Sequence, residues 1–130
     1  MLPKALVVED DAATREALRR IVRDEGFEVD AVADGEHALE LIFAQRYAVV
    51  VLDIVLPGMS GAEVMEELLA TSPDILESIV VVTGLDVSEI RKLYPGVREA
   101  LGKPVFPARL RKAVRRFLPG SDEASGIIVA

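Results

Sequence analysis

The segment VVVLD at residues 49–53 is the clearest indication of the fold of this 130-residue chain. Four apolar residues, three of them β-branched, run without interruption into a carboxylate, Asp53. A continuous apolar run of this length is typical of a strand covered on both faces, as in a parallel sheet. It is far shorter than the 18 or more residues that a membrane-spanning helix needs. We therefore expect residues 49–52 to form part of a central buried strand that delivers Asp53 at its carboxyl end.

Segments of the same kind alternate with amphipathic segments along the chain. Strands are expected at residues 5–8, 27–32, 47–52, 79–82 and 97–101, the last of them weak. Helices are expected at residues 12–25, 36–45, 86–93, after Ser60 and from Pro107 onward. Apolar strands that alternate with amphipathic helices predict a single α/β domain, a doubly wound parallel sheet of five strands with helices on both faces.

Local signals set the ends of several helices. Ser60 and Glu63 have the spacing of a capping box, which opens the third helix. Pro95 must end the segment 86–93 after about two turns, so a short or irregular fourth helix is expected. The last helix is expected to carry an apolar stripe on one face, formed by Phe106, Leu110, Ala113, Val114 and Phe117. The period ends at Pro119, which predicts a domain of residues 1–118 and a tail or linker of residues 119–130.

Composition excludes several classes of function. The chain has no cysteine and one histidine, His37, which argues against disulfides, thiol chemistry and histidine-based metal sites. The net charge of −7 argues against direct binding of nucleic acid. No signal peptide and no membrane-spanning segment is expected, so we predict a cytoplasmic location. Any chemistry must use carboxylates, hydroxyls, lysine and arginine.

Four of the expected strands deliver polar groups at their carboxyl ends. Glu9 and Asp10 follow the first strand, Asp53 the third, Thr83 the fourth and Lys103 the fifth. Parallel strands end at one edge of the sheet, where two carboxylates ~4 Å apart repel by roughly 4 kcal/mol at an effective dielectric of about 20. Either a pKa rises or a cation neutralises the cluster, and an oxygen-only set suits Mg²⁺. A metal, a lysine and a hydroxyl around a carboxylate can serve a phosphoryl group.

At these residues the chain resembles the receiver domain of two-component response regulators. The matching pieces are residues 7–11, 53–61, 82–84 and 103–104, and the resemblance covers about residues 4 to 118. It implies a five-stranded parallel sheet in the order 2-1-3-4-5. It also implies a phosphoacceptor signalling module of a phosphorelay, which catalyses only its own phosphorylation and dephosphorylation. The implied partner is a sensor histidine kinase or a histidine phosphotransfer protein.

The resemblance implies a role for each matching residue. Asp53 is the implied phosphoacceptor, which takes the phosphoryl group from a phosphohistidine. The implied Mg²⁺ ligands are Asp10, Asp53, the backbone carbonyl of Val55 and, through water, Glu9. Thr83 is the implied switch hydroxyl, and Lys103 is the implied phosphoryl-binding lysine, held by a cis peptide bond to Pro104.

One position departs from the family pattern. The family usually places an aromatic residue three positions before the pocket lysine, and this chain has Ala100 there. An aromatic rotamer switch cannot operate through an alanine. We therefore expect signalling to rely on rearrangement of the short helix at residues 86–93.

Other functions remain open on the sequence alone. A degenerate receiver that scaffolds a partner without phosphorylation is one, although Asp53, Asp10, Thr83 and Lys103 are all intact. A Mg²⁺-dependent phosphohydrolase with an aspartate nucleophile is another, but it needs a second acid where this chain has Val55. The last helix carries a basic face that is either merely solvated or a surface for a partner or a homodimer: Arg109, Arg111, Lys112, Arg115 and Arg116.

Overall fold

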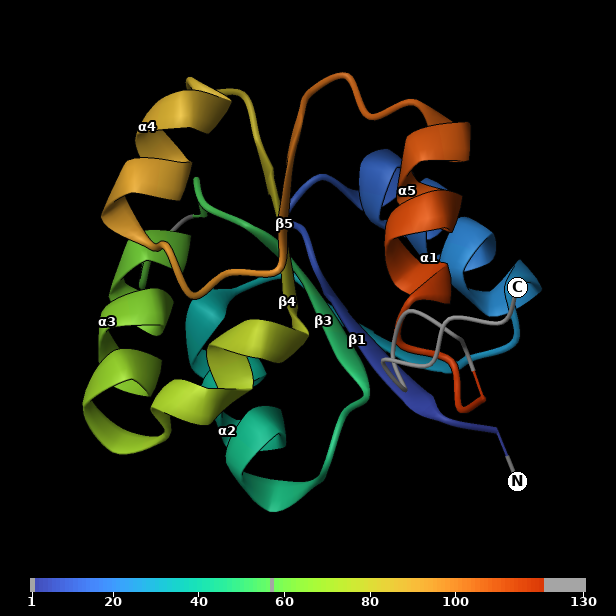
Figure 1. Cartoon of the computed structure of the whole chain (residues 1–130), viewed down its shortest axis with the longest axis horizontal. Helices are drawn as coiled ribbons and strands as arrows, with labels where there is room; N and C mark the ends of the chain where they lie inside the picture. Colours follow the sequence, from blue (N-terminus) through green and yellow to red (C-terminus); the bar gives the residue numbers. More distant parts are fainter. Residues whose placement is uncertain (1, 57, 121–130) are drawn as a thin grey trace, which may run out of the picture.

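The computed structural model describes residues 2–56 and 58–120 (Figure 1). The strands are β1 (Lys4–Val8), β2 (Glu28–Val32), β3 (Val49–Asp53), β4 (Ile79–Thr83) and β5 (Glu99–Gly102). The helices are α1 (Ala12–Asp24), α2 (Gly35–Ala44), α3 (Gly61–Thr71), α4 (Val87–Leu93) and α5 (Pro107–Arg115), with a 3₁₀ helix, η1 (Pro73–Ser78). All five predicted strands and all five predicted helices are present. Most of the predicted tail, residues 121–130, lies outside the described part of the chain.

The five strands form one parallel sheet in the order β2-β1-β3-β4-β5, which confirms the predicted order. Helices α1 and α5 cover one face of the sheet, and α2, α3 and α4 cover the other (Figure 1). Every residue of β3 and β4 is buried, because both strands lie inside the sheet with helices on each side. The continuous apolar run at residues 49–52 is thereby explained.

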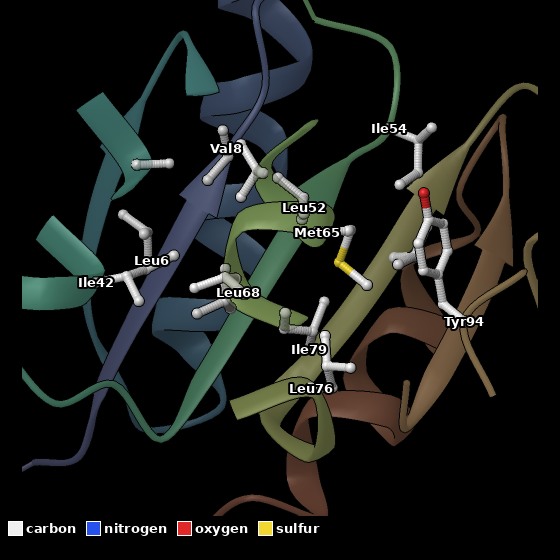
Figure 2. Packing of buried hydrophobic residues seen from close by; sticks show 14 of the residues in the cluster. Leu6, Val8, Ile42, Leu52, Ile54, Met65, Leu68, Leu76, Ile79 and Tyr94 are labelled. Atoms are coloured by element: carbon white, nitrogen blue, oxygen red, sulfur yellow. The ribbon is translucent and has the colours of Figure 1, made fainter. Parts of the chain in front are cut away.

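The core consists of two layers, one on each face of the sheet. Alternate residues of β3 point to opposite layers: Val50 and Leu52 to one, Val49 and Val51 to the other. Figure 2 shows the first layer, in which side chains of the sheet meet those of α2, α3 and η1. The labelled side chains are Leu6, Val8, Ile42, Leu52, Ile54, Met65, Leu68, Leu76, Ile79 and Tyr94.

Polar side chains cap the first turns of two helices, including the predicted cap at Ser60. The Ser60 hydroxyl accepts the Glu63 N–H at 3.1 Å and caps α3. The Asp11 carboxylate accepts the Thr14 N–H at 2.9 Å and caps α1. At the other end of α1, Gly26 adopts a left-handed φ of 113°, which allows the chain to turn back into β2.

The structure confirms one local prediction about the helices and contradicts another. Helix α4 has only seven residues, which confirms the expected short fourth helix. The prediction that Phe106 shares the apolar face of the last helix is wrong, because the residue precedes α5 and is 63% exposed. Phe106 is the residue before the first turn of α5, in an extended conformation, so it does not continue the apolar stripe that Leu110, Ala113 and Val114 bury. The 3₁₀ helix η1 was not predicted.

The strand register brings the chemistry-bearing residues to one edge of the sheet. Val8 pairs with Leu52, so the residues that follow them, Glu9 and Asp53, lie level with each other. Farther along, Thr83 pairs with Gly102, the residue before Lys103. None of the helices in the described ranges combines the length and apolar character needed to cross a bilayer.

Candidate functional site

Asp53 ends β3 as a nearly buried carboxylate, with 3% of the residue exposed. Its Oδ1 accepts the backbone N–H of Val55 at 3.0 Å, and its Oδ2 accepts from Lys103 Nζ at 2.8 Å. The local turn and the lysine that follows β5 therefore both orient this carboxylate. A carboxylate held in this way is a preorganised nucleophile.

Glu9 is fully buried beside it. Its Oε1 accepts from Lys103 Nζ at 2.6 Å, and its Oε2 accepts the Asp11 N–H at 3.2 Å. Burial raises the pKa of Glu9 above its ordinary value, while the hydrogen bonds from Lys103 and Asp11 oppose that rise. The sequence alone did not indicate that Glu9 would be the most buried acid of the site.

Lys103 links the two acids from the far side of the pocket. Its backbone N–H donates to the Thr83 carbonyl at 2.7 Å, and its peptide bond to Pro104 is cis, as the resemblance implied. Partial burial lowers the pKa of Lys103, but the hydrogen bonds to Asp53 and Glu9 outweigh it and leave the pKa above its ordinary value. The side chain is 31% exposed, so its ammonium remains within reach of a ligand.

Asp10 completes an acidic cluster that fits a divalent cation. Oxygen atoms of Glu9, Asp10 and Asp53 lie within 4.8 Å of one another, and Asp10 is exposed. Three carboxylates face the single ammonium of Lys103, which leaves an excess of negative charge for a cation to neutralise. The donors are all oxygens, the set that Mg²⁺ prefers. The residues therefore fit the metal that the sequence predicted.

Thr83 lies at the end of the next strand, fully buried. Its Oγ1 accepts the Leu85 N–H at 2.9 Å, and in the described part of the chain no hydrogen bond joins it to the acids. Val55 presents an exposed side chain, 57% accessible, at the rim of the site. The structure thus brings four predicted residues together: Glu9, Asp10, Asp53 and Lys103.

Arg15, which the sequence did not indicate as a site residue, holds the acidic loop in place. One guanidinium nitrogen of this residue donates to the backbone carbonyls of Glu9, at 3.0 Å, and Asp10, at 3.2 Å. Arg15 lies in the first turn of α1, and its side chain reaches back to the loop that carries Glu9 and Asp10. In the sequence it is one of several charged residues of an amphipathic helix, and only its place in the first turn after the acids could have indicated the role.

The sequence analysis also missed a close backbone contact at Gly61. The Gly61 N–H donates to the Ile54 carbonyl at 2.9 Å, which closes the loop between β3 and α3. A Cβ at Gly61 would lie 2.3 Å from the Asp53 carbonyl oxygen and 2.5 Å from the Ile54 Cα. Only glycine fits there, and its absent side chain lets α3 pack directly behind the acidic residue.

The sheet order and this acidic pocket define a phosphoacceptor regulatory module of the response regulator type. Residues 5–115 match the response regulator receiver domain family. The chain belongs to that family.

Relatives and solved structures agree with this assignment. "Response regulator MprA" of Mycolicibacterium vanbaalenii is 40% identical over 129 residues, which cover 95% of this chain and 54% of the relative. The chain therefore spans about half the length of the curated relatives it matches. The Thermotoga maritima response regulator TrrA, solved in complex with Mg(2+)-BeF, is 31% identical with a TM-score of 0.78, over 90% of this chain and all of that one. The receiver domain of a putative LuxO repressor from Vibrio parahaemolyticus gives a TM-score of 0.82 at 25% identity, with both chains covered fully.

Proposed function

We propose that Asp53 accepts a phosphoryl group from a phosphohistidine of a sensor kinase or phosphotransfer protein. The observation that carries the proposal is the position of the Asp53 carboxylate, which lies 2.8 Å from the Lys103 ammonium inside a cluster of metal-binding acids. The similar response regulator TrrA from Thermotoga maritima was solved in complex with Mg(2+)-BeF, and this supports the same chemistry here. Val55, two residues after Asp53, supplies no acid, which disfavours a phosphohydrolase.

The transfer is an in-line displacement at phosphorus. One Asp53 oxygen forms a bond to phosphorus while the P–N bond to the donor histidine breaks, and the imidazole leaves with the electron pair and takes a proton. The Val55 N–H holds the carboxylate in orientation during attack. The Lys103 ammonium moves from the Asp53 oxygen to the transferring phosphoryl oxygens and neutralises part of their charge.

Mg²⁺ is the cation that we propose for the acidic cluster, held by Asp10, Asp53 and the Val55 carbonyl, with Glu9 acting through water. When bound, the ion neutralises charge on the carboxylates and on the phosphoryl oxygens. The chain's own contribution is to fix the acids: Arg15 holds the Glu9 and Asp10 carbonyls, and Lys103 holds the Glu9 and Asp53 side chains.

Replacing Arg15 with methionine tests this arrangement without requiring any reaction. The variant loses both guanidinium bonds to the acidic loop, and we expect the dissociation constant for Mg²⁺ to rise about tenfold, as is usual for the loss of a group that orients metal ligands. Isothermal titration calorimetry measures the change. Arg20→Met, on the exposed side of the same helix, is the matched control. An affinity for Mg²⁺ equal to that of the control would show that Arg15 does not position the acids.

Lys103→Met tests the proposed role of the ammonium. At saturating Mg²⁺ we expect the rate of phosphorylation by acetyl phosphate to fall about 10²- to 10³-fold, because one charge that stabilises the transition state is gone. The control is Lys92→Met, an exposed lysine of α4. Radiolabel incorporation with time gives the rates. A wild-type rate in the Lys103 variant would remove this residue from the mechanism.

Thr83 is proposed as the switch. We expect its hydroxyl to release the Leu85 N–H as it turns toward a phosphoryl group on Asp53, and Leu85 lies one residue before Asp86, the N-cap of α4. Loss of that bond loosens the segment that leads into a helix of only seven residues. The link from Thr83 through Leu85 to α4 favours signalling by rearrangement of α4. An aromatic switch on β5 is not available, because the chain has Ala100 there.

A groove beside the pocket supports the proposed partner. It has a volume of about 710 Å³, runs between α1 and the segment after β5, and is lined by apolar side chains such as Ala17 and Ile21 with Lys103 at its rim. Because the groove is continuous with the phosphoryl-binding lysine, a histidine-bearing helical protein can pack its apolar surface there with the phosphohistidine over Asp53.

We propose residues 1–118 as the domain that performs this function, with residues 119–130 as a tail or linker. The family match over residues 5–115 and the end of α5 at Arg115 support this boundary.

A further inference from the structure

A hollow lies at the edge of the sheet where the strands begin, opposite the acidic residues. It occupies about 430 Å³ between the end of α2 and η1. Both of its sides lead directly into the sheet, because Tyr47 lies two residues before β3 and Ser78 is the residue before β4. Figure 1 shows this edge in the lower half of the picture, with α2 beside it. The phosphoacceptor chemistry at the other edge does not use this hollow.

An exposed aromatic ring adjoins the hollow. Phe43, in the last turn of α2, lines it and is 54% exposed. The preceding residue, Ile42, is buried in the core, so α2 packs on the sheet without the ring of Phe43. A ring beside a concave surface can insert into the same concave surface of another molecule, and aromatic residues are enriched at such contacts.

The hollow carries one charge of each sign. Arg46 and Asp74 both line it, and both are exposed. Neither of them forms an ion pair with another residue in the described ranges, 2–56 and 58–120. Although they share one hollow, the two side chains are thus too far apart to neutralise each other within one molecule. An occupant that satisfies both must bring a carboxylate, a cation and an apolar group.

The floor of the hollow is held in place before anything binds. Tyr47 is buried, and its hydroxyl donates to the Asp30 carboxylate of β2 at 2.7 Å. The ammonium of Lys4 donates to the Gln45 side chain and pairs with Asp30 at 3.1 Å. These bonds tie the residues between α2 and β3 to β1 and β2. A preformed surface of this kind loses little conformational freedom on association.

We propose that this hollow is the contact between two copies of the chain related by a two-fold axis. In this contact, Phe43 of each copy lies in the hollow of the other, and Arg46 of each copy pairs with Asp74 of the other. A two-fold axis places the same patch on both sides, so the two ion pairs form together. The occupant is a second copy because it supplies the ring and both signs of charge that the hollow requires.

The mixed charge of the hollow disfavours partners of a single sign. An acidic segment would meet like charge at Asp74, and a basic segment would meet like charge at Arg46. The net charge of −7 makes two copies repel at long range, but this repulsion is screened beyond about 8 Å at physiological ionic strength. The ion pairs act at contact. Because the contact is small, we expect a weak dimer that depends on concentration.

Association through this hollow leaves both phosphoacceptor pockets free. Asp53 lies at the carboxyl end of β3, whereas the hollow adjoins the start of the same strand. The dimer therefore presents its two acidic pockets away from the contact, and its formation does not depend on phosphorylation. A failure of this inference and a failure of the chemistry proposed at Asp53 are thus separate results.

Sedimentation velocity of the full chain, from about 10 µM to about 1 mM, measures the association. We expect the weight-average sedimentation coefficient to rise with concentration. In Phe43→Ser we expect the dissociation constant to rise about tenfold, because the ring that fills the hollow is lost. Arg46→Glu and Asp74→Arg each place like charges opposite each other twice, so each variant alone should remain monomeric over this range.

A mixture of the two charge variants gives the sharpest comparison. When Arg46→Glu meets Asp74→Arg, the introduced glutamate of one chain faces the introduced arginine of the other. The unchanged Arg46 of the second chain faces the unchanged Asp74 of the first. Both ion pairs are restored, so we expect the mixture to associate like the wild-type chain.

Glu36→Arg is the matched control, because it makes the same change of charge as Asp74→Arg at the other end of α2, outside the hollow. We expect it to associate like the wild type, and urea unfolding checks that every variant is folded. A wild-type chain that stays monomeric up to the highest concentration would overturn the proposal, and so would a mixture of the charge variants that stays monomeric. A dimer that persists in both charge variants would also overturn it, since the contact would then lie on another face.

Discussion

Replacement of Asp53 by asparagine is expected to abolish stable phosphorylation of the chain by acetyl phosphate. The amide is nearly the same size but has no anionic oxygen to attack phosphorus. Asp53 is the carboxylate that ends β3, where Lys103 and the Val55 N–H orient it. Incorporation of radiolabelled phosphate in the presence of Mg²⁺ measures the effect. The fold should persist, because asparagine keeps an oxygen that can accept from Lys103.

Asp74→Asn is the matched control for this result. Asp74 is an exposed carboxylate in η1, on the edge of the sheet from which β4 begins, and its loss should leave labelling unchanged. Undiminished labelling of the Asp53 variant would assign the acceptor to another residue, and would contradict the proposed roles of the pocket residues around Asp53.

A single methyl group at position 61 is expected to have the second large effect. In Gly61→Ala the new Cβ would lie 2.3 Å from the Asp53 carbonyl oxygen and 2.5 Å from the Ile54 Cα, and backbone atoms cannot rotate away as a side chain can. Overpacking of this kind costs about 3 kcal/mol of unfolding free energy. Because the clash displaces the acceptor itself, the phosphorylation rate should also fall, by about 10²-fold for a shift of ~1 Å.

Gly84→Ala provides the comparison for stability. A Cβ at Gly84 meets no atom within 4 Å, so the same substitution there should change the unfolding free energy little. Urea denaturation of both variants gives the difference. If Gly61→Ala is as stable as Gly84→Ala, the close packing of α3 behind Asp53 does not constrain the acceptor.

The sheet and most of the pocket could be predicted because their signals are local. Apolar runs such as residues 49–52 mark buried strands, and the carboxyl ends of parallel strands must meet at one edge. The positions of Asp53 and Lys103 at strand ends therefore predicted that they converge, and they lie 2.8 Å apart. The absence of an aromatic residue between residues 97 and 103 was equally visible.

What could not be predicted depends on contacts between distant elements. Burial of Glu9 follows from its place between the strands and Lys103, 94 positions away in the sequence. The role of Arg15 needs the angle at which α1 leaves the sheet, and the need for glycine at position 61 follows from the approach of one backbone to another. The pattern of apolar residues along the sequence does not indicate any of these three contacts.

Phe106 shows the opposite error. Its spacing fits the apolar stripe of α5, yet it precedes the helix, so its side chain projects outward.

The residue that carries the phosphate can be identified after reaction of the chain with acetyl phosphate and Mg²⁺. Borohydride reduces an acyl phosphate to the alcohol, so peptide mapping by mass spectrometry marks the residue that carried it. We expect a single reduced side chain, at Asp53. Reduction at Glu9 or Asp10 instead, or none in a chain that nevertheless binds Mg²⁺, would contradict it.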